Sequence, residues 1–157
     1  MSAPPELFGV GDLLDINVWP ALSDADHAHH PAAQRFWAET SHINIQWRRH
    51  TAGGFKRLIC QPALMGDKAL TPPQAFDAYQ KIRQQARVKL QADPDNLELV
   101  WRQLAEKAPW PPRLWSAAYL AALAVLATAA NLRLVSFNRD FSRFPGLNWL
   151  HLPKETA

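Results

Sequence analysis

The sequence predicts an α/β domain with a mainly parallel central sheet, and three observations lead to this expectation. Strand-like and helix-like segments alternate along the chain. Apolar runs end in polar residues, as at Asp15 and Asn138. The 157 residues are 48% hydrophobic and 20% charged, enough to bury a core. We therefore expect one domain over residues 1–157, a three-layer α/β/α structure with helices on both faces of the sheet.

The first half of the chain supplies two of the expected strands and two helices. The run "DLLDIN" is strand-like and ends at a polar tip, Asp15. "HPAAQRFWAET" has a proline near its start and apolar residues at helical spacing. "INIQW" alternates in strand fashion, which predicts that Ile43, Ile45 and Trp47 share one face. Residues 51–60 are helix-like in spite of two glycines.

The second half continues the alternation. Thr71, followed by two prolines, predicts a helix N-terminus. "RVKLQA" is a short strand candidate, and Asp95 opens the next expected helix. The longest helix is expected over residues 111–130, followed by the strands "LRLVSFN" and "LNWLHL". Since strands separated by helices favour parallel pairing, these elements complete the predicted sheet.

Composition limits the compartment and the partners. Lys and Arg exceed Asp and Glu by 17 to 14, so the formal charge of +3 and the pI near 9.3 are compatible with nucleic acid. A single cysteine, Cys60, cannot form an intrachain disulfide. "MSAPPELFGV" lacks the features of a signal peptide, and the apolar run 117–130 is shorter than the roughly 20 residues that cross a bilayer. We expect a cytoplasmic protein without a membrane segment.

Chemistry is expected at the carboxyl ends of the strands, where Asp15 and Asn138 would share one edge of the sheet. An acid after an apolar strand allows two interpretations. One is a phosphatase of the haloacid dehalogenase type, in which this acid is the nucleophile. That family also needs paired acids after a later strand, and the late strand here ends in "FNRDF". The sequence therefore disfavours this interpretation.

The other interpretation rests on segments that follow one another in order and spacing: "LLDINVWPAL", "RRHTAGGFKRLICQPALMG", "LTPPQAFDAY", "LWSAAYLAALA" and "LRLVSFNRDFSRFPGLNWL". Over about residues 13–152 the chain resembles the PIN-domain toxins of the VapBC type. This resemblance implies a toxin of a type II toxin–antitoxin system, an endoribonuclease that is usually a homodimer and is held inactive by an antitoxin. It also implies Mg²⁺ or Mn²⁺ bound by a cluster of carboxylates.

The acids that this family uses are largely replaced. Asp15 matches the first acid, and Asn17 matches the polar residue two positions later. Ala52, Ala117 and Asn138 stand where the resemblance places the other three acids. Because Mg²⁺ binds best to anionic oxygens, we expect weak metal binding and an impaired or inactivated nuclease.

Two alternatives stay open at this site. Other acids, Asp140, Asp24 or Asp26, could replace the lost ligands, and Asp140 is the first candidate after Asp15 itself. Otherwise the chain is a catalytically silent PIN-like module that binds antitoxin and perhaps RNA. In either case Asn138 would line the site together with Asn17, and Ser136 would be a polar support.

The densest basic stretch and the tryptophans are further candidates for contact with RNA. The stretch contains Arg48, Arg49, Lys56 and Arg57, which could bind an RNA backbone, contact an antitoxin or form a solvated helix face.

Three of the seven tryptophans, Trp37, Trp101 and Trp115, are expected in the core because they lie on apolar helix faces. Trp19 and Trp47 are the candidates for surface stacking on bases.

Overall fold

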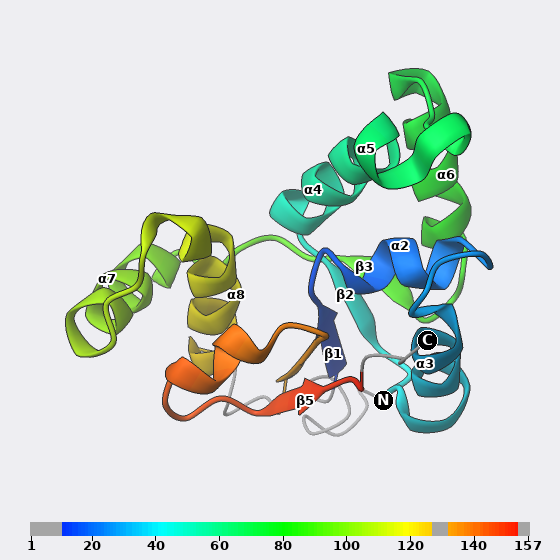
Figure 1. The fold of residues 1–157 in the computed structure, drawn as a ribbon. Coiled ribbons are helices and arrows are strands. Elements are labelled where there is room, and N and C mark those ends of the chain that lie inside the picture. The colour runs from blue at the N-terminus through cyan, green and yellow to red at the C-terminus, as the bar shows by residue number, and fades with distance from the viewer. Residues whose placement is uncertain (1–10, 127–131, 154–157) are drawn as a thin grey trace.

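A five-stranded parallel sheet forms the centre of the molecule in Figure 1, a computed structural model that describes residues 11–126 and 132–153. The strand order is β3-β2-β1-β4-β5, and every neighbouring pair is parallel. The strands are β1 (Gly11–Leu14), β2 (Ile45–Trp47), β3 (Val88–Leu90), β4 (Leu132–Ser136) and β5 (Trp149–His151). The predicted α/β class with a parallel sheet is confirmed.

The central position of β1 determines where its last residues lie. Leu14 pairs with Val135 of β4, and the backbone N–H of Asp15 donates to the carbonyl of Val135 at 2.8 Å. On its other side, β1 pairs with β2, with Leu13 opposite Gln46. The carboxyl ends of β1 and β4 therefore meet at one edge of the sheet, as expected for Asp15 and the segment after Ser136.

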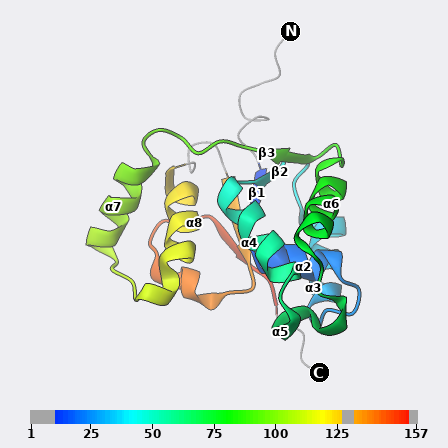
Figure 2. The ribbon, with the colours of Figure 1, turned by 90° about the horizontal axis from the view of Figure 1, so that it is seen from above.

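Helices cover both faces of the sheet (Figures 1 and 2). One apolar cluster includes residues of α2, α3, α4 and α6, and the other includes residues of α7 and α8. Successive side chains of β1 point to opposite faces of the sheet, so Leu14 belongs to the first cluster and Leu13 to the second. The helices are α2 (Val18–Ser23), α3 (His30–Arg35), α4 (Arg49–Ile59), α5 (Pro62–Met65), α6 (Pro72–Arg83), α7 (Leu97–Lys107) and α8 (Trp115–Leu126).

Short helical turns of other types join these elements. A π-helical turn, η1 (Phe36–Thr40), extends α3, and the 3₁₀ turns are η2 (Gly66–Lys68), η3 (Pro112–Leu114) and η5 (Arg139–Arg143). The long helix expected over residues 111–130 is thus a 3₁₀ turn followed by α8, and its predicted end lies outside the described residues. Helix α4 begins at Arg49, two residues earlier than expected.

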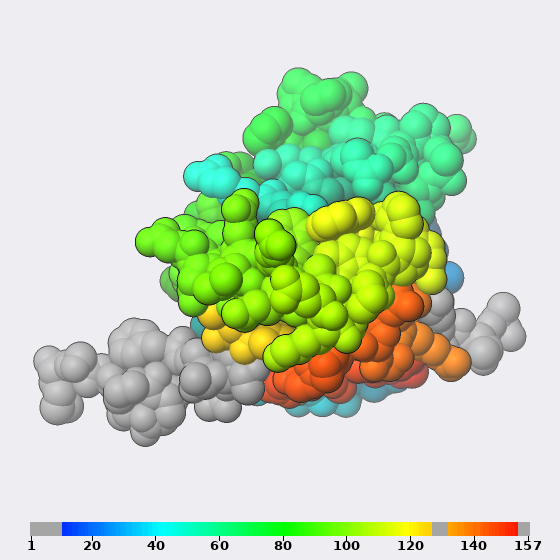
Figure 3. Space-filling model, turned by 90° about the vertical axis from the view of Figure 1, so that its left-hand side faces the viewer, coloured from blue at the N-terminus to red at the C-terminus, as the bar shows by residue number. Residues whose placement is uncertain are grey.

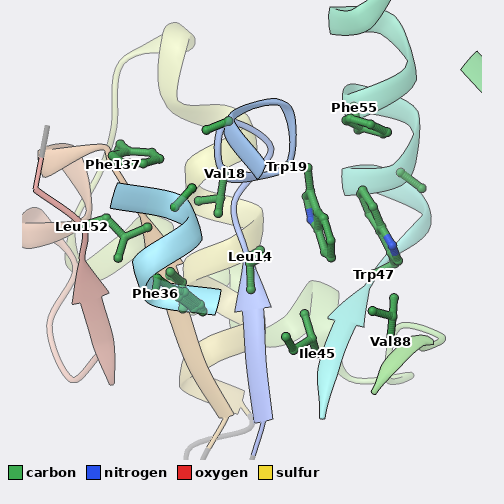
Figure 4. Packing of buried hydrophobic residues seen from close by; sticks show 14 of the residues in the cluster. Leu14, Val18, Trp19, Phe36, Ile45, Trp47, Phe55, Val88, Phe137 and Leu152 are labelled. Atoms are coloured by element: carbon green, nitrogen blue, oxygen red, sulfur yellow. The ribbon is translucent and has the colours of Figure 1, made fainter. Parts of the chain in front are cut away.

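Aromatic rings fill the first cluster. The rings of Trp19 and Trp47 stack with centroids 3.8 Å apart, and Phe55 of α4 lies 5.4 Å from Trp47 (Figure 4). Trp19 and Trp47 are 1% and 0% exposed, so the prediction that they lie on the surface is wrong. They are buried because α2 and α4 both pack over β2.

The second cluster is built on α8, whose side chains from Ala117 to Ala124 are all buried and, apart from Tyr119, are Ala or Leu. Helix α7 packs against α8 and forms the outer surface on this side, with the segment 139–151 below it (Figure 3). Trp115 is 57% exposed, so its predicted place in the core is wrong, whereas Trp101 packs against the cluster. No helix within residues 11–126 and 132–153 is long and apolar enough to cross a membrane.

Two local predictions have opposite outcomes. The side chain of Thr71 accepts a hydrogen bond from the N–H of Gln74, and the side chain of Gln74 accepts one from the N–H of Thr71, which confirms the helix start. Ile43 is 81% exposed and precedes β2, so it does not share the buried face of Ile45 and Trp47. The three residues of β2 are buried whatever their parity, since the strand lies between two others.

Candidate active site

Asp15 lies at the carboxyl end of β1 and is only 9% exposed. Its Oδ2 accepts a hydrogen bond from Oγ of Ser136 at 2.6 Å, and its Oδ1 accepts one from the N–H of Ile16 at 2.7 Å. Burial raises the pKa of the Asp15 carboxyl, and the two hydrogen bonds, which favour the charged form, offset part of that rise. Both carboxyl oxygens are thus engaged by the protein itself.

The segment after β4 continues this network. The N–H of Asn138 donates to Oγ of Ser136 at 2.9 Å, and Oδ1 of Asn138 accepts from the N–H of Asp140 at the same distance. The Asp140 carboxylate turns to Arg113, whose Nη1 lies 2.7 Å from Oδ2, and this contact lowers the pKa of Asp140. The structure therefore brings Asp15, Ser136 and Asn138 together and pairs Asp140 with an arginine.

Asn17 offers the site a neutral oxygen. Its Oδ1 is buried and lacks a hydrogen-bond partner. In the part of the chain that the structure describes, the other buried side-chain atoms without a partner are nitrogens. Asn17 directly precedes α2 and lies two residues after Asp15. Among the described residues, its amide oxygen is therefore a buried side-chain acceptor that the protein leaves unused, two residues after the first acid.

The other two positions that the resemblance assigns to acids are buried methyl groups. Ala52 lies near the N-terminal end of α4, is 4% exposed and belongs to the first apolar cluster. Ala117 lies in the first turn of α8, is 8% exposed and belongs to the second cluster. Neither residue has a polar side-chain atom, so neither can bind a cation or accept a proton.

The remaining alternative acids bind a lysine. Asp24 and Asp26 follow α2, and both form ion pairs with Nζ of Lys68, the one to Asp24 at 3.3 Å. The hydrogen bond from the N–H of Asp26 is the largest cause of the lowered pKa of Asp24, and Lys68 adds to it. These acids therefore serve a contact between the α2–α3 loop and η2.

A polar contact that the sequence did not predict joins α4 to α8. Nε2 of His50 lies 2.7 Å from Oγ of Ser116, and the rings of His50 and Tyr119 have centroids 4.5 Å apart. Burial lowers the pKa of His50, and the charge of Asp93 opposes this effect. His50 and Ser116 are 66 residues apart and belong to no recognisable motif, so sequence spacing gave no signal for this pair.

Comparison with known proteins identifies the family of the chain. Over 148 residues the chain is 32% identical to ribonuclease VapC41 of Mycobacterium tuberculosis, which covers 90% of this chain and 99% of the relative. The chain belongs to the VapC family. No protein-family model matches it.

Two solved structures have the same fold as this VapC-family chain. VapC20 of M. tuberculosis, a toxin that cleaves the sarcin–ricin loop, has a TM-score of 0.61 at 23% identity, over 87% of this chain and 95% of that chain. VapBC2 of Rickettsia felis, bound to a DNA fragment from its promoter, has a TM-score of 0.61 at 13% identity, over 90% and 98%. These similarities confirm the predicted PIN-like fold.

The residues present do not fit the Mg²⁺ or Mn²⁺ ion that the VapC resemblance implies. No three His, Cys, Asp or Glu side chains within the described ranges are grouped so that they could hold a metal ion. Asp15 is the single acid at the four family positions, and both of its oxygens already accept hydrogen bonds. A hard divalent cation binds most strongly to anionic oxygens, whereas Asn17 and Asn138 supply neutral ones.

The four basic residues proposed for RNA do not form one surface. Arg48 is 7% exposed, and its guanidinium donates to the carbonyl of Ala92 at 2.5 Å and to Gln46 at 2.8 Å. This burial removes Arg48 from the set that an RNA backbone could contact. Nζ of Lys56 lies over the ring of Phe76, at 4.2 Å, whereas Arg49 and Arg57 are exposed.

Proposed function

We propose that this chain is the toxin component of a type II toxin–antitoxin system, derived from a metal-dependent endoribonuclease and impaired in metal-dependent RNA cleavage. Its family membership supports action on RNA. The observation that carries the impairment is that Asp15 is the single carboxylate at the four family positions, where Ala52, Ala117 and Asn138 supply no negative charge. A metal ion bound at Asp15 would therefore meet little anionic charge from the protein.

The replacements are of the kind that spare the fold. Ala is the best helix former, so Ala52 and Ala117 are compatible with the helices in which they lie. Asn138 caps η5 through Oδ1, a role that Asp could also fill. The chain therefore keeps the architecture of the family while it lacks most of the charge that binds Mg²⁺ or Mn²⁺.

The partners of this proposal are RNA, a cognate antitoxin and a second copy of the chain. The formal charge of +3 and the exposed Arg49 and Arg57 favour an anionic partner such as RNA. The similarity to VapBC2 supports the antitoxin, and the homodimer is what the resemblance to the family implies. Co-purification with the antitoxin and light scattering of the free chain would test these two associations.

The deciding experiment restores two acids. RNA cleavage by the native chain is compared with that by the double variant Ala117→Asp, Asn138→Asp, each with Mg²⁺, with Mn²⁺ and with chelator. We expect metal-dependent cleavage from the double variant alone. Because position 117 is 8% exposed, its new carboxylate should lower the melting temperature in chelator, and Mg²⁺ should raise it again.

A control and a contrary result complete this test. The same double variant with Asp15→Asn should lose both the cleavage and the stabilisation by Mg²⁺, because the first acid is then neutral. If the native chain cuts RNA with Mg²⁺ as fast as the double variant and stops in chelator, the impairment is disproved.

A catalytically silent binding module is the second candidate, and the missing acids at positions 52, 117 and 138 also favour it. It predicts that the native chain binds RNA and antitoxin but cleaves no RNA under any condition. Detection of cleaved RNA that depends on a residue of this chain would separate the two candidates.

A further inference from the structure

Trp115, the first residue of α8, presents a large aromatic ring to solvent. The seven tryptophans all lie within the described residues, and Trp115 is the exposed one, at 57%. Two T-shaped contacts hold its ring, one with Trp101 of α7 at 5.8 Å between centroids and one with Trp110 at 5.2 Å. These contacts restrict the orientation of the ring while more than half of the residue stays accessible.

A hollow in the surface lies beside this ring and has a volume of about 340 Å³. Its lining is mostly apolar and consists of Glu98, Trp101, Arg102, Ala105, Trp110 and Trp115. Sites for small molecules in proteins have volumes of roughly 300–1,000 Å³ and are rich in aromatic side chains. The hollow is therefore large enough for a flat ring of the size of a nucleobase.

Two arginines make the adjoining surface positive. Nη1 of Arg113 lies 2.7 Å from Oδ2 of Asp140, and both Arg113 and Arg143 lower the pKa of Asp140, so two cations act on one carboxylate. Phe144, the residue after Arg143, has its ring 6.1 Å from that of Trp110. In the view of Figure 3, the segment that leads into α8 borders the orange η5. Aromatic and cationic side chains thus share one surface.

This surface borders two of the positions at which the family resemblance places acids. Trp115 is two residues before Ala117, and Asp140 is two residues after Asn138. The backbone N–H of Asp140 donates to Oδ1 of Asn138 at 2.9 Å, which fixes the start of η5 beside the site. A nucleotide chain that reaches the site from this side would pass over the surface.

The charge of the surface decides between a second copy of the chain and RNA as its occupant. In a two-fold interface each patch faces its own copy, so Arg113 and Arg143 would meet like charges. RNA instead offers aromatic bases to the ring and phosphates to the arginines. Arg102 on the other rim is balanced by Glu98 and by its ion pair with Glu106, so it adds no net charge.

We propose that Trp115 is a stacking platform for an unpaired base of RNA, with a neighbouring phosphate at Arg143. The chain then prefers single-stranded RNA to duplex RNA, because the bases of a duplex stack on one another and cannot reach an aromatic side chain. The inference rests on the proposed function in one respect, that the chain acts on RNA. It adds a residue that selects which RNA binds, and it needs neither a metal ion nor cleavage.

The test measures binding by fluorescence anisotropy in excess chelator. The probes are a labelled single-stranded RNA of random sequence, a duplex RNA of the same length and an abasic oligomer with the same backbone. Trp115→Ala should lower the affinity for the single strand about 5- to 100-fold and leave the other two affinities unchanged. Trp115→Phe keeps an aromatic ring and should lose less. Leu99→Ala, at an exposed apolar position on α7, is the control and should bind like the native chain.

The salt dependence of binding separates the ring from the arginine. Trp115→Ala removes no charge, so the slope of log affinity against log salt should stay the same. Arg143→Ala removes one phosphate contact and should reduce that slope by about 0.7, the value for a single strand. Thermal unfolding of each variant shows that a lost affinity is not a lost fold.

Several results would overturn the inference. These are an unchanged affinity of Trp115→Ala for the single strand, an equal loss for the abasic oligomer or the duplex, or an equal loss in Leu99→Ala. Light scattering adds a further one, since a native dimer that becomes a monomer in Trp115→Ala would assign the surface to a second copy.

The native chain separates this inference from the proposed function. If the native chain binds single-stranded RNA and Trp115→Ala binds it equally well, action on RNA stands and the role of Trp115 fails. If the native chain binds none of the three probes, and the double variant Ala117→Asp, Asn138→Asp cuts no RNA with Mg²⁺, both fail.

Discussion

Oγ of Ser136 lies 2.6 Å from Oδ2 of Asp15 and joins the ends of two neighbouring strands across 121 residues of sequence. The hydroxyl also accepts from the N–H of Asn138, so one side chain connects the first family acid with the position of the last. Asp15 is therefore part of the structure of the sheet edge as well as the remaining acid of the site. Its carboxyl group should affect stability even where no metal is bound.

The variant Asp15→Asn tests how the carboxyl group of Asp15 affects the stability of the folded chain at different pH values. Burial raises the pKa of Asp15 in the folded chain above 3.8, so the folded state holds the proton more tightly than the unfolded state. The protonated carboxyl contributes its full stability at pH values below the pKa of Asp15 in the unfolded chain. This contribution is lost as pH rises through the pKa of Asp15 in the folded chain. Asn cannot ionise, so the variant should gain stability relative to the native chain as pH rises from about 4.

Urea unfolding at a series of pH values measures this difference in the free energy of unfolding. Asp67→Asn, at an exposed position in η2, is the control and should show a smaller dependence on pH. A difference between Asp15→Asn and the native chain that is constant from pH 4 to pH 8 would contradict the prediction.

A buried ion pair at the amino end of the sheet predicts a large loss of stability. Asp12 is 0% exposed, and Nε of Arg133 donates to its Oδ1 at 2.8 Å while the N–H of His42 donates to its Oδ2 at 2.7 Å. Arg133→Met would leave a buried carboxylate with less compensation. We expect a loss of about 3 kcal/mol in the free energy of unfolding, the low end for such pairs, since Arg133 keeps 19% of its side chain exposed.

The control for this prediction is an exposed pair on α7. Arg102 contacts Glu106 one turn later, with both side chains more than half exposed. Arg102→Met should cost less than about 1 kcal/mol by the same chemical denaturation. Equal losses from the two substitutions would show that Asp12 does not depend on Arg133.

The exposed basic residues of α4 predict a salt-dependent contact with RNA. Arg49→Ala and Arg57→Ala should each lower the affinity for RNA and reduce the slope of log affinity against log salt by about 1. Arg102→Ala removes the same charge from α7 and should leave that slope unchanged. Fluorescence anisotropy at several salt concentrations measures all three, and equal slopes for the native chain and its α4 variants would place the RNA elsewhere.

The sequence was sufficient to predict the sheet and the edge where the site lies. Alternating strands and helices require parallel pairing, and parallel strands put their carboxyl ends together, so Asp15 and Asn138 had to meet. Ser136, expected as a polar support, donates to Asp15. The helix that begins after Thr71 was predictable because its cap is local in sequence.

Features that depend on contacts between distant segments were not predictable. Trp19 and Trp47 stack on each other because α2 and β2 are neighbours in space, and Arg48 is buried because the segment after β3 lies beside it. The exposure of Trp115 follows from its place at the start of α8, before the helix enters the core. The partner of His50 likewise lies on another helix, so no pattern within α4 revealed it.

Two adjacent glycines in α4 give the last prediction. A Cβ on Gly53 would meet no atom within 4 Å, whereas a Cβ on Gly54 would lie 2.5 Å from Cδ1 and 3.2 Å from Cγ2 of Ile16. Ala is favoured over Gly inside a helix by about 1 kcal/mol. Gly53→Ala should therefore raise the free energy of unfolding by about that amount, while Gly54→Ala should lower it by about 1–3 kcal/mol through overpacking.

The pair separates helix propensity from the close approach of α4 to the site. Since Ile16 directly follows Asp15 and donates to its Oδ1, a shift of Ile16 should also disturb the carboxyl group. Gly54→Ala should then change the pH dependence of stability that Asp15 contributes, and Gly53→Ala should not. If both alanine variants are stabilised equally, the Ile16 side chain yields to the added methyl group, and Gly54 does not determine how closely α4 approaches the end of β1.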